Sequence, residues 1–352
     1  MNIWKIKKDF YVYFIPNKEV DVVFIELIVD TGNIYEDEKT FGLSHVLEHV
    51  LFTNEICDQL FQRGIIYNGI TDMNYVKYYF YLNKKYTNYV LNIILKFLNF
   101  DKLDEKHFDR EIKVIEEELS QDLDDPKTIL ENKHCKNIFG DHILSKKVEE
   151  QIENVKNCKF NDITRLYKNE YKINKCSLLI SGNYKKNKII KKLKKGIKNN
   201  KIGENNYMKV VKRGEYPIYD FIKNDKMDKC YCKITFVDDI KKKDKYVAEF
   251  TSKLLKNVLF SKLRKKSLVY GIHIQFEMLT HICLLNIEYN SKCKHFRKVR
   301  DIILKEIEEM EVYIYDKYYK MTIENINMDK VINEKKIDIM ENAFFYDNII
   351  IN

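Results

Sequence analysis

The order of strand-like and helix-like segments, which repeats along this chain, restricts the fold more than any other feature. The first half opens with alternating strand patterns and ends with a strand, CSLLISGN at 176–183, followed by a Lys-rich helix. Between these lie a helix around 41–52, a strand pattern VKYYFYLN at 76–83, and helical patterns at 89–98 and 104–122.

A second series of the same kind follows a polar linker around 199–206. Strand-like CYCKITFV leads to a helix at 248–263, then two strands, then a helix at 296–311. We therefore predict an α+β fold of two related sandwich domains, each an antiparallel-rich sheet covered by helices. The predicted domains are 1–200 and 201–352, the second shortened at its end.

Length and composition agree with two folded domains. The chain has 352 residues, 45% of them hydrophobic, which is long for one ordinary core. No apolar run approaches the roughly 18 residues of a membrane span. The first thirty residues contain neither a secretory signal nor a conventional presequence, so we expect a cytoplasmic protein or one of a mitochondrion-related organelle.

The net charge of +9 raises the question of nucleic-acid binding. Much of it lies in KKNKIIKKLKKGIKNNK at 185–201, where Ile189, Ile190 and Leu193 fall at helical spacing. This pattern predicts an amphipathic helix with a solvated lysine face, without an arginine-aromatic module. We expect no nucleic-acid partner.

A possible metal site lies in SHVLEHVLF at 44–52. On a helix, His45, Glu48 and His49 gather on one side, opposite an apolar side that buries the helix. Residues at i and i+4 are neighbours, so the two imidazoles can converge on one zinc ion. H-x-x-E-H is the inverted zinc motif, in which the glutamate is the general base, although two histidines hydrogen-bonded in an ordinary helix would read the same way.

A catalytic zinc needs a third protein ligand, and the helix DREIKVIEEELSQ supplies carboxylates. Glu117 points opposite the core stripe and is the weakest candidate. Glu111 and Glu118 lie two turns apart along one edge, and Glu116 lies on the other edge. Periodicity alone does not choose between Glu116 and Glu118.

With these motifs, the chain resembles the pitrilysin/insulinase family of zinc metallopeptidases, which includes insulin-degrading enzyme and the mitochondrial processing peptidase beta subunit. The resemblance runs through TGNIYEDEKTFGLSHVLEHVLF, YNGITDMNYVKYYFYL, DREIKVIEEELSQDLDDP, SLLISGN and LFSKLRKKSLVYGI, and so covers nearly the whole chain.

The resemblance implies a role for each matching residue. His45, His49 and Glu118 would bind one Zn²⁺ per chain, Glu48 would be the catalytic base, and Glu111 would support the ligands. A further set matches positions that contact substrate: Asn68, Thr71, Tyr79, Arg264 and Tyr270.

The resemblance also implies an activity and a partner. It indicates hydrolysis of unfolded peptides, presequence processing among the options, by one half of a clamshell that closes as a homodimer or as a heterodimer with a second family half. The alternative is a non-catalytic scaffold or partner subunit of the same fold.

Overall fold

The chain forms two compact units, each described below by itself. The computed structural model describes residues 2–19, 21–100, 102–121, 123–199, 201–204, 216–239, 245–279, 282–310 and 318–324. The first unit holds the described residues up to 121 and from 147 to 204, and the second holds 123–146 and the described residues from 216 onward. The end of the expected linker beyond residue 204 and the expected shortened end of the second domain lie outside the described residues.

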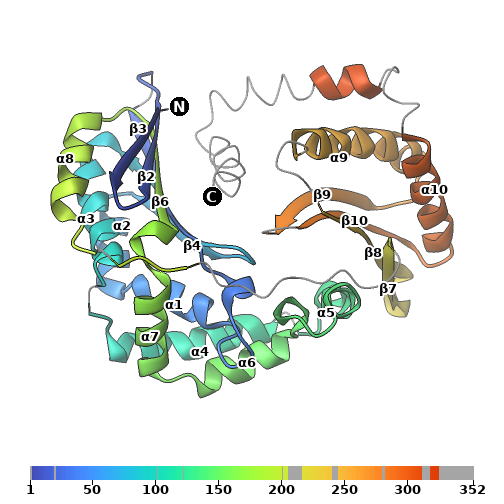
Figure 1. The fold of residues 1–352 in the computed structure, drawn as a ribbon. Helices are drawn as coiled ribbons and strands as arrows, with labels where there is room; N and C mark the ends of the chain where they lie inside the picture. The colour runs from blue at the N-terminus through green and yellow to red at the C-terminus, as the bar shows by residue number, and fades with distance from the viewer. Residues whose placement is uncertain are drawn as a thin grey trace. The chain divides into compact units, whose positions relative to one another are not determined.

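The first unit is built on a six-stranded sheet with the strand order β1-β2-β6-β3-β5-β4 (Figure 1). Its strands are β1 Asn2–Lys7, β2 Phe10–Pro16, β3 Val22–Val29, β4 Ile66–Thr71, β5 Val76–Asn83 and β6 Cys176–Gly182. All neighbouring strands are antiparallel except β2 and β6, which are parallel. Strand β3, VVFIELIV, is almost wholly buried because it lies inside the sheet and is covered on both faces.

Helices cover one face of this sheet. They are α1 Leu43–Leu51, α2 Asn54–Gln62, α3 Thr87–Leu98, α4 Glu105–Gln121, α6 Val148–Asn157, α7 Phe160–Glu170 and α8 Lys186–Gly196. Inward residues of β2, β3, β5 and β6 pack with these helices in one large apolar cluster. On the other face, Tyr13, Phe24, Ile28 and Leu179 form a smaller cluster with neighbouring tyrosines.

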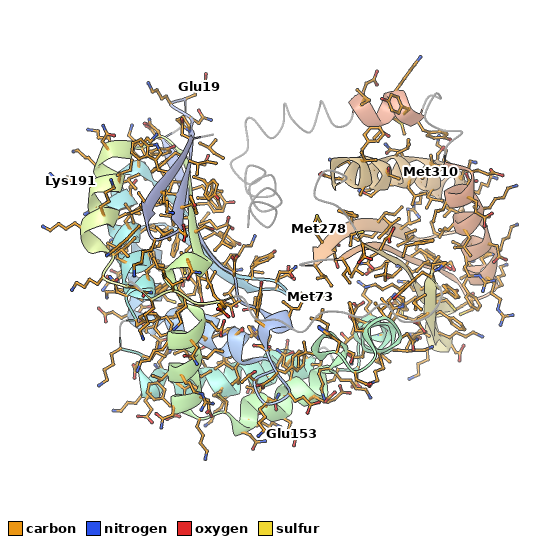
Figure 2. The ribbon with its side chains drawn as sticks, in the orientation of Figure 1. Glu19, Met73, Glu153, Lys191, Met278 and Met310 are labelled. Atoms are coloured by element: carbon orange, nitrogen blue, oxygen red, sulfur yellow. The ribbon has the colours of Figure 1, made fainter. Side chains whose placement is uncertain are left out.

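The Lys-rich segment forms α8 as predicted. Ile189, Ile190 and Leu193 are its buried residues. Lys191 is exposed and points away from the sheet (Figure 2). The helix is therefore amphipathic, with its apolar stripe in the core of the first unit.

The second unit repeats the plan with a four-stranded antiparallel sheet of order β7-β8-β10-β9. Its elements are β7 Ile218–Asn224, β8 Lys229–Asp238, α9 Lys245–Leu259, β9 Gly271–Leu279, β10 Ile282–Lys292 and α10 Phe296–Glu308. A cluster of buried residues from β8, α9, β10 and α10 forms its core. No helix among the described residues is both long and apolar enough to cross a membrane.

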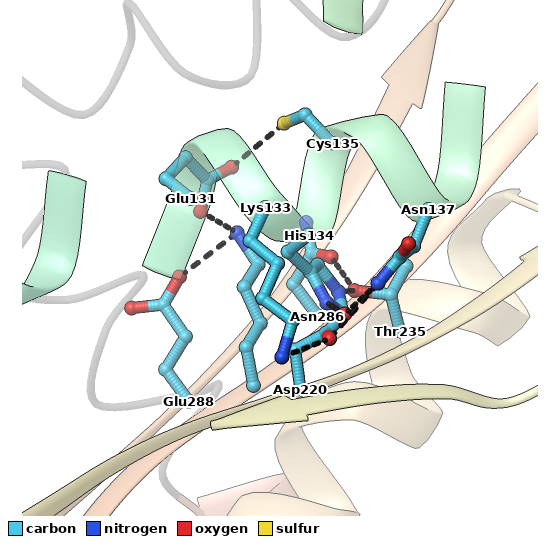
Figure 3. Close-up of polar contacts among 10 residues, drawn as sticks. Glu131, Lys133, His134, Cys135, Asn137, Asp220, Thr235, Asn286 and Glu288 are labelled. Atoms are coloured by element: carbon cyan, nitrogen blue, oxygen red, sulfur yellow. Dashed lines mark hydrogen bonds and ion pairs between the residues drawn. The ribbon is translucent and has the colours of Figure 1, made fainter. Parts of the chain in front are cut away.

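Helix α5, Pro126–Phe139, belongs to the second unit although the sequence suggested a boundary at residue 200. Its His134 is fully buried, with Nδ1 2.8 Å from Asp220 Oδ2 on β7 and Nε2 2.7 Å from Thr235 Oγ1 on β8 (Figure 3). The Asn137 amide donates to both Asp220 oxygens at 2.9 Å. Burial opposes ionisation of Asp220, but hydrogen bonds from His134 and Asn137 outweigh it and lower the pKa of Asp220 to about 2. Satisfied polar groups therefore attach α5 to a sheet that lies more than 80 residues later in the chain.

Candidate metal centre

Helix α1 carries the HxxEH motif and is anchored at its first turn. Gly42 precedes it in the left-handed region at φ 95°, a conformation that glycine adopts without strain. The Glu36 carboxylate accepts the backbone N–H groups of Gly42 and Ser44 at 2.8 and 2.7 Å. A carboxylate at a helix N-terminus satisfies donors that the helix itself leaves unpaired, so Glu36 fixes where α1 begins.

Three of the predicted ligands come together. Donor atoms of His45, His49 and Glu118 all lie within 4.8 Å of one another. The two imidazole rings are 4.8 Å apart between centroids, and His49 Nε2 is 3.7 Å from Glu118 Oε2. Burial, with a smaller effect of His49, lowers the pKa of His45 to about 4, which keeps that ring in the neutral form that binds metals.

The donor set fits zinc. Two imidazole nitrogens and one carboxylate oxygen are the protein ligands of several catalytic zinc sites, which keep a further position open. The Glu118 side chain is 56% exposed, so the group of donors opens to solvent on that side. The chain can hold a zinc ion here with access for water.

Helix α4 packs against α1, and this contact decides between the carboxylates that periodicity left open. Glu118 faces His49, whereas Oε1 of Glu116 lies 2.9 Å from Nζ of Lys156 on α6. Glu117 is exposed. Of the two candidates, only Glu118 is among the residues that could hold the ion.

Glu111 does not belong to the group of metal-binding candidates but contacts one of them, His49. Its Oε2 is 3.0 Å from His49 Nδ1, and its Oε1 is 3.6 Å from Nδ1 of the buried His107. When His49 binds a metal through Nε2, its Nδ1 carries the proton, and this N–H donates a hydrogen bond to Glu111. The sequence did not single out His107, although its position four residues before Glu111 on one helix was a usable signal.

Glu48 is held beside the ligands in a confined place. It is 7% exposed, and Thr71 Oγ1 on β4 donates to its Oε2 at 3.2 Å. Gly69, which faces it from β4, leaves the space that the carboxylate fills. Burial raises the pKa of Glu48 to about 7, although His49 and Thr71 act against it. The side of α1 that carries Glu48 and His49 therefore packs against β4 and α4.

Two predicted substrate-contacting residues of the first unit, Asn68 and Thr71, lie on the edge strand β4, and the third, Tyr79, lies on the neighbouring strand β5. Asn68 on β4 pairs directly with Tyr79 on β5, and Thr71 pairs with Val76. Strand β4 is the last strand of the sheet. Asn68 is exposed, so its neighbourhood offers an open strand edge next to Glu48.

Arg264 and Tyr270 belong to the second unit. Arg264 ends the π-helical turn Phe260–Arg264, and its Nη1 donates to the Val269 carbonyl at 3.1 Å. Tyr270 is 49% exposed just before β9. Both side chains are exposed and lie six residues apart. They belong to the second unit, whereas the zinc-binding candidates of α1 belong to the first.

Comparisons with known proteins show to which family the chain belongs. Residues 11–152 match the sequence profile described as Insulinase (Peptidase family M16), and residues 157–320 match the one described as Peptidase M16 inactive domain. A protein of Bacillus subtilis named uncharacterized zinc protease YmxG is 28% identical over 163 residues, which cover 44% of this chain and 39% of that protein. A protein of Rickettsia felis named uncharacterized zinc protease is 27% identical over 42% of this chain and 37% of its own length. The match thus spans under two fifths of these curated relatives.

Solved structures share the fold over a longer stretch. A protease from Helicobacter pylori has a TM-score of 0.84 at 16% identity and covers 99% of this chain and 89% of its own. Pitrilysin has a TM-score of 0.69 at 16% identity, covering 91% of this chain and 37% of pitrilysin. The two matched profiles together span most of the chain, and the chain belongs to the pitrilysin/insulinase family, peptidase family M16.

Proposed function

We propose that this protein is a zinc-dependent endopeptidase that hydrolyses unfolded peptides. The observation that carries the proposal is the convergence of His45, His49 and Glu118, with Glu48 buried beside them and an open strand edge next to it. Zinc, when bound by these three residues, would supply a Lewis acid for the attack of water on a peptide carbonyl.

The chain's own residues would divide the remaining tasks. Glu48 accepts the proton of the attacking water and delivers it to the leaving amine, as general base and then general acid. Thr71 holds the Glu48 carboxylate through its hydroxyl at 3.2 Å. Glu111 holds the ring of His49 through Nδ1 and fixes its tautomer.

The substrate would bind as an added strand. Strand β4 is the last strand of the sheet, so no strand among the described residues pairs with its outer backbone groups, and an extended peptide can pair with them. Main-chain pairing selects unfolded segments more than it selects a sequence. Asn68, Thr71 and Tyr79 would contact the peptide along this edge.

The rest of the proposal concerns assembly and setting. The likeness to pitrilysin covers 37% of that chain, and we propose that this protein works as a homodimer or with a second family half, in which Arg264 and Tyr270 reach the substrate carbonyl. Presequence processing in a mitochondrion-related organelle and scavenging of peptides in the cytoplasm both suit the same site.

The test is cleavage of an unstructured peptide of about 20 residues by the purified chain, with and without a chelator, since extended peptides suit a strand edge. We expect chelator-sensitive cleavage that Glu48→Gln abolishes while zinc content stays at one per chain, and His49→Ala should lose both zinc and activity. Glu117→Gln, an exposed carboxylate on α4, is the matched control and should behave as wild type.

Other outcomes would reject parts of the proposal. Full activity of Glu48→Gln would remove Glu48 as the base. Stoichiometric zinc without cleavage would point to a missing partner subunit, which size-exclusion chromatography with light scattering would examine. Neither zinc nor cleavage would favour a non-catalytic scaffold of the same fold.

A further inference from the structure

A cavity of about 540 Å³ lies in the first unit between the beginnings of α3 and α8. Its lining residues come from within the segments 84–91 and 183–192; Lys191 is not among them, and none of them belongs to α1, α4 or β4. It is therefore separate from the candidate metal centre. Five lysines line this cavity, called the lysine pocket below: Lys84, Lys85, Lys185, Lys188 and Lys192.

Most of this positive charge is unbalanced. Lys84 pairs with Asp21 at 2.6 Å. Within the described part of the chain, no carboxylate pairs with the other four lysines, and Lys192 donates to the neutral amide of Asn92. Four ammonium groups around one cavity repel each other, and a bound anion would relieve that repulsion.

Two helix N-termini add to the same field. The pocket is lined by Thr87 and Asn88 in the first turn of α3, and by the N-cap residue Lys185 and the first-turn residue Lys188 of α8. Neither helix has a side-chain cap or an acidic residue in its first turn. The positive dipole ends of the two helices favour a bound anion such as phosphate.

The rest of the lining is apolar. Leu91 and Ile189 belong to the hydrophobic core and form part of the wall. The ring of Tyr184 also lines the pocket and packs on Phe14, with centroids 5.5 Å apart. The Tyr184 hydroxyl is buried and has no hydrogen-bond partner among the residues that the structure describes. A ligand that fits this lining has an apolar body as well as a charged group.

We propose that the lysine pocket binds a small phosphorylated organic molecule. Its phosphate lies among Lys85, Lys185, Lys188 and Lys192 at the two helix N-termini, and its organic body lies on Leu91, Ile189 and Tyr184. The volume suits one ligand of metabolite size. A nucleic-acid strand would instead need cations spread along an extended groove.

The first experiment uses pyridoxal 5′-phosphate as the probe, because it combines a phosphate with an aromatic body and its aldehyde forms an imine with a nearby lysine. After borohydride reduction, peptide mapping of the full chain shows which lysines reacted. We expect labelling of the pocket lysines at least tenfold faster than of Lys191, which points outward from α8 (Figure 2), and protection by inorganic pyrophosphate. Labelling of Lys191 at the same rate as the pocket lysines would overturn the proposal.

The second experiment measures pyrophosphate binding by calorimetry at physiological salt, where weak surface attraction is screened. Lys185→Gln/Lys188→Gln should weaken binding about tenfold or more, since two charge-assisted contacts are lost. Lys191→Gln/Lys195→Gln removes the same charge from the same helix outside the pocket and should change binding less than twofold. Equal effects of the two double variants would overturn the proposal.

A third experiment, with lipid vesicles, distinguishes a phosphate on a lipid headgroup from one on a soluble molecule. Cosedimentation with vesicles that contain a phosphoinositide, lost in Lys185→Gln/Lys188→Gln but kept in Lys191→Gln/Lys195→Gln, would identify the phosphate as a lipid headgroup. Binding of pyrophosphate without cosedimentation would identify a soluble ligand. Cosedimentation lost equally in both double variants would reject the pocket in favour of a general basic surface.

Discussion

Glu111 should control how tightly the protein holds zinc, although it is not itself among the three ligands. Its Oε2 accepts the His49 Nδ1 proton at 3.0 Å, and its side chain is only 17% exposed, so the hydrogen bond is charged and partly shielded from water. Such a bond contributes about 1.5–3 kcal/mol. At about 1.4 kcal/mol per factor of ten, Glu111→Ala should raise the zinc Kd by about 10- to 100-fold.

A graded series makes the reasoning sharper. Glu111→Gln keeps an acceptor oxygen but loses the charge, so its zinc Kd should fall between those of wild type and Glu111→Ala. Glu117→Ala removes an exposed glutamate from the same helix and should leave the Kd unchanged. Competition with a chromophoric chelator gives each Kd, and circular dichroism checks that α4 is intact. A Kd for Glu111→Ala within twofold of wild type, or an equal loss in Glu117→Ala, would refute the reasoning.

Three further predictions concern other parts of the chain. Asp220→Asn should lower the urea midpoint of unfolding at pH 7. The folded pKa of Asp220, about 2, lies below the ordinary 3.8, so its ionised form stabilises the fold above about pH 4 and this stabilisation is lost as the pH falls toward 2. The difference in midpoint between variant and wild type should therefore shrink toward pH 2, and a constant difference would contradict this. Leu178→Ala removes a fully buried side chain from β6 and should lower the free energy of unfolding, measured in denaturant titrations, by about 2–5 kcal/mol. The zinc stoichiometry should not change. A loss below about 1 kcal/mol would show that neighbouring side chains fill the space left by the leucine. Arg264→Lys and Tyr270→Phe should each lower kcat about 100-fold or more at unchanged zinc content, as is usual for groups that stabilise developing charge. An unchanged kcat would show that neither residue takes part in the reaction.

Local sequence was enough to predict how the two histidines of α1 lie relative to each other. His45 and His49 are one helical turn apart, so any helix through them brings the two rings to one side, and the observed α1 does so. The Lys-rich segment likewise forms the predicted amphipathic helix, since its apolar residues recur at helical spacing. The two-domain α+β plan followed from the repeated order of strand and helix patterns.

Features that depend on contacts between distant segments could not be read in this way. Glu116 and Glu118 lie on opposite edges of one core stripe, and only the packing of α4 against α1 and α6 turns Glu118 to His49 and Glu116 to Lys156. Helix α5 precedes the second sheet by some 80 residues, and only its tertiary contacts, such as those of His134 with Asp220 and Thr235, assign it there.

The lysine pocket shows the same division between local and long-range information. The sequence by itself determined that α8 carries a lysine face, because helical periodicity is a property of neighbouring residues. Only the tertiary structure decided that Lys84 and Lys85 lie across a cavity from that face, since the packing of α3 beside α8 depends on how both helices bury their apolar stripes on one sheet.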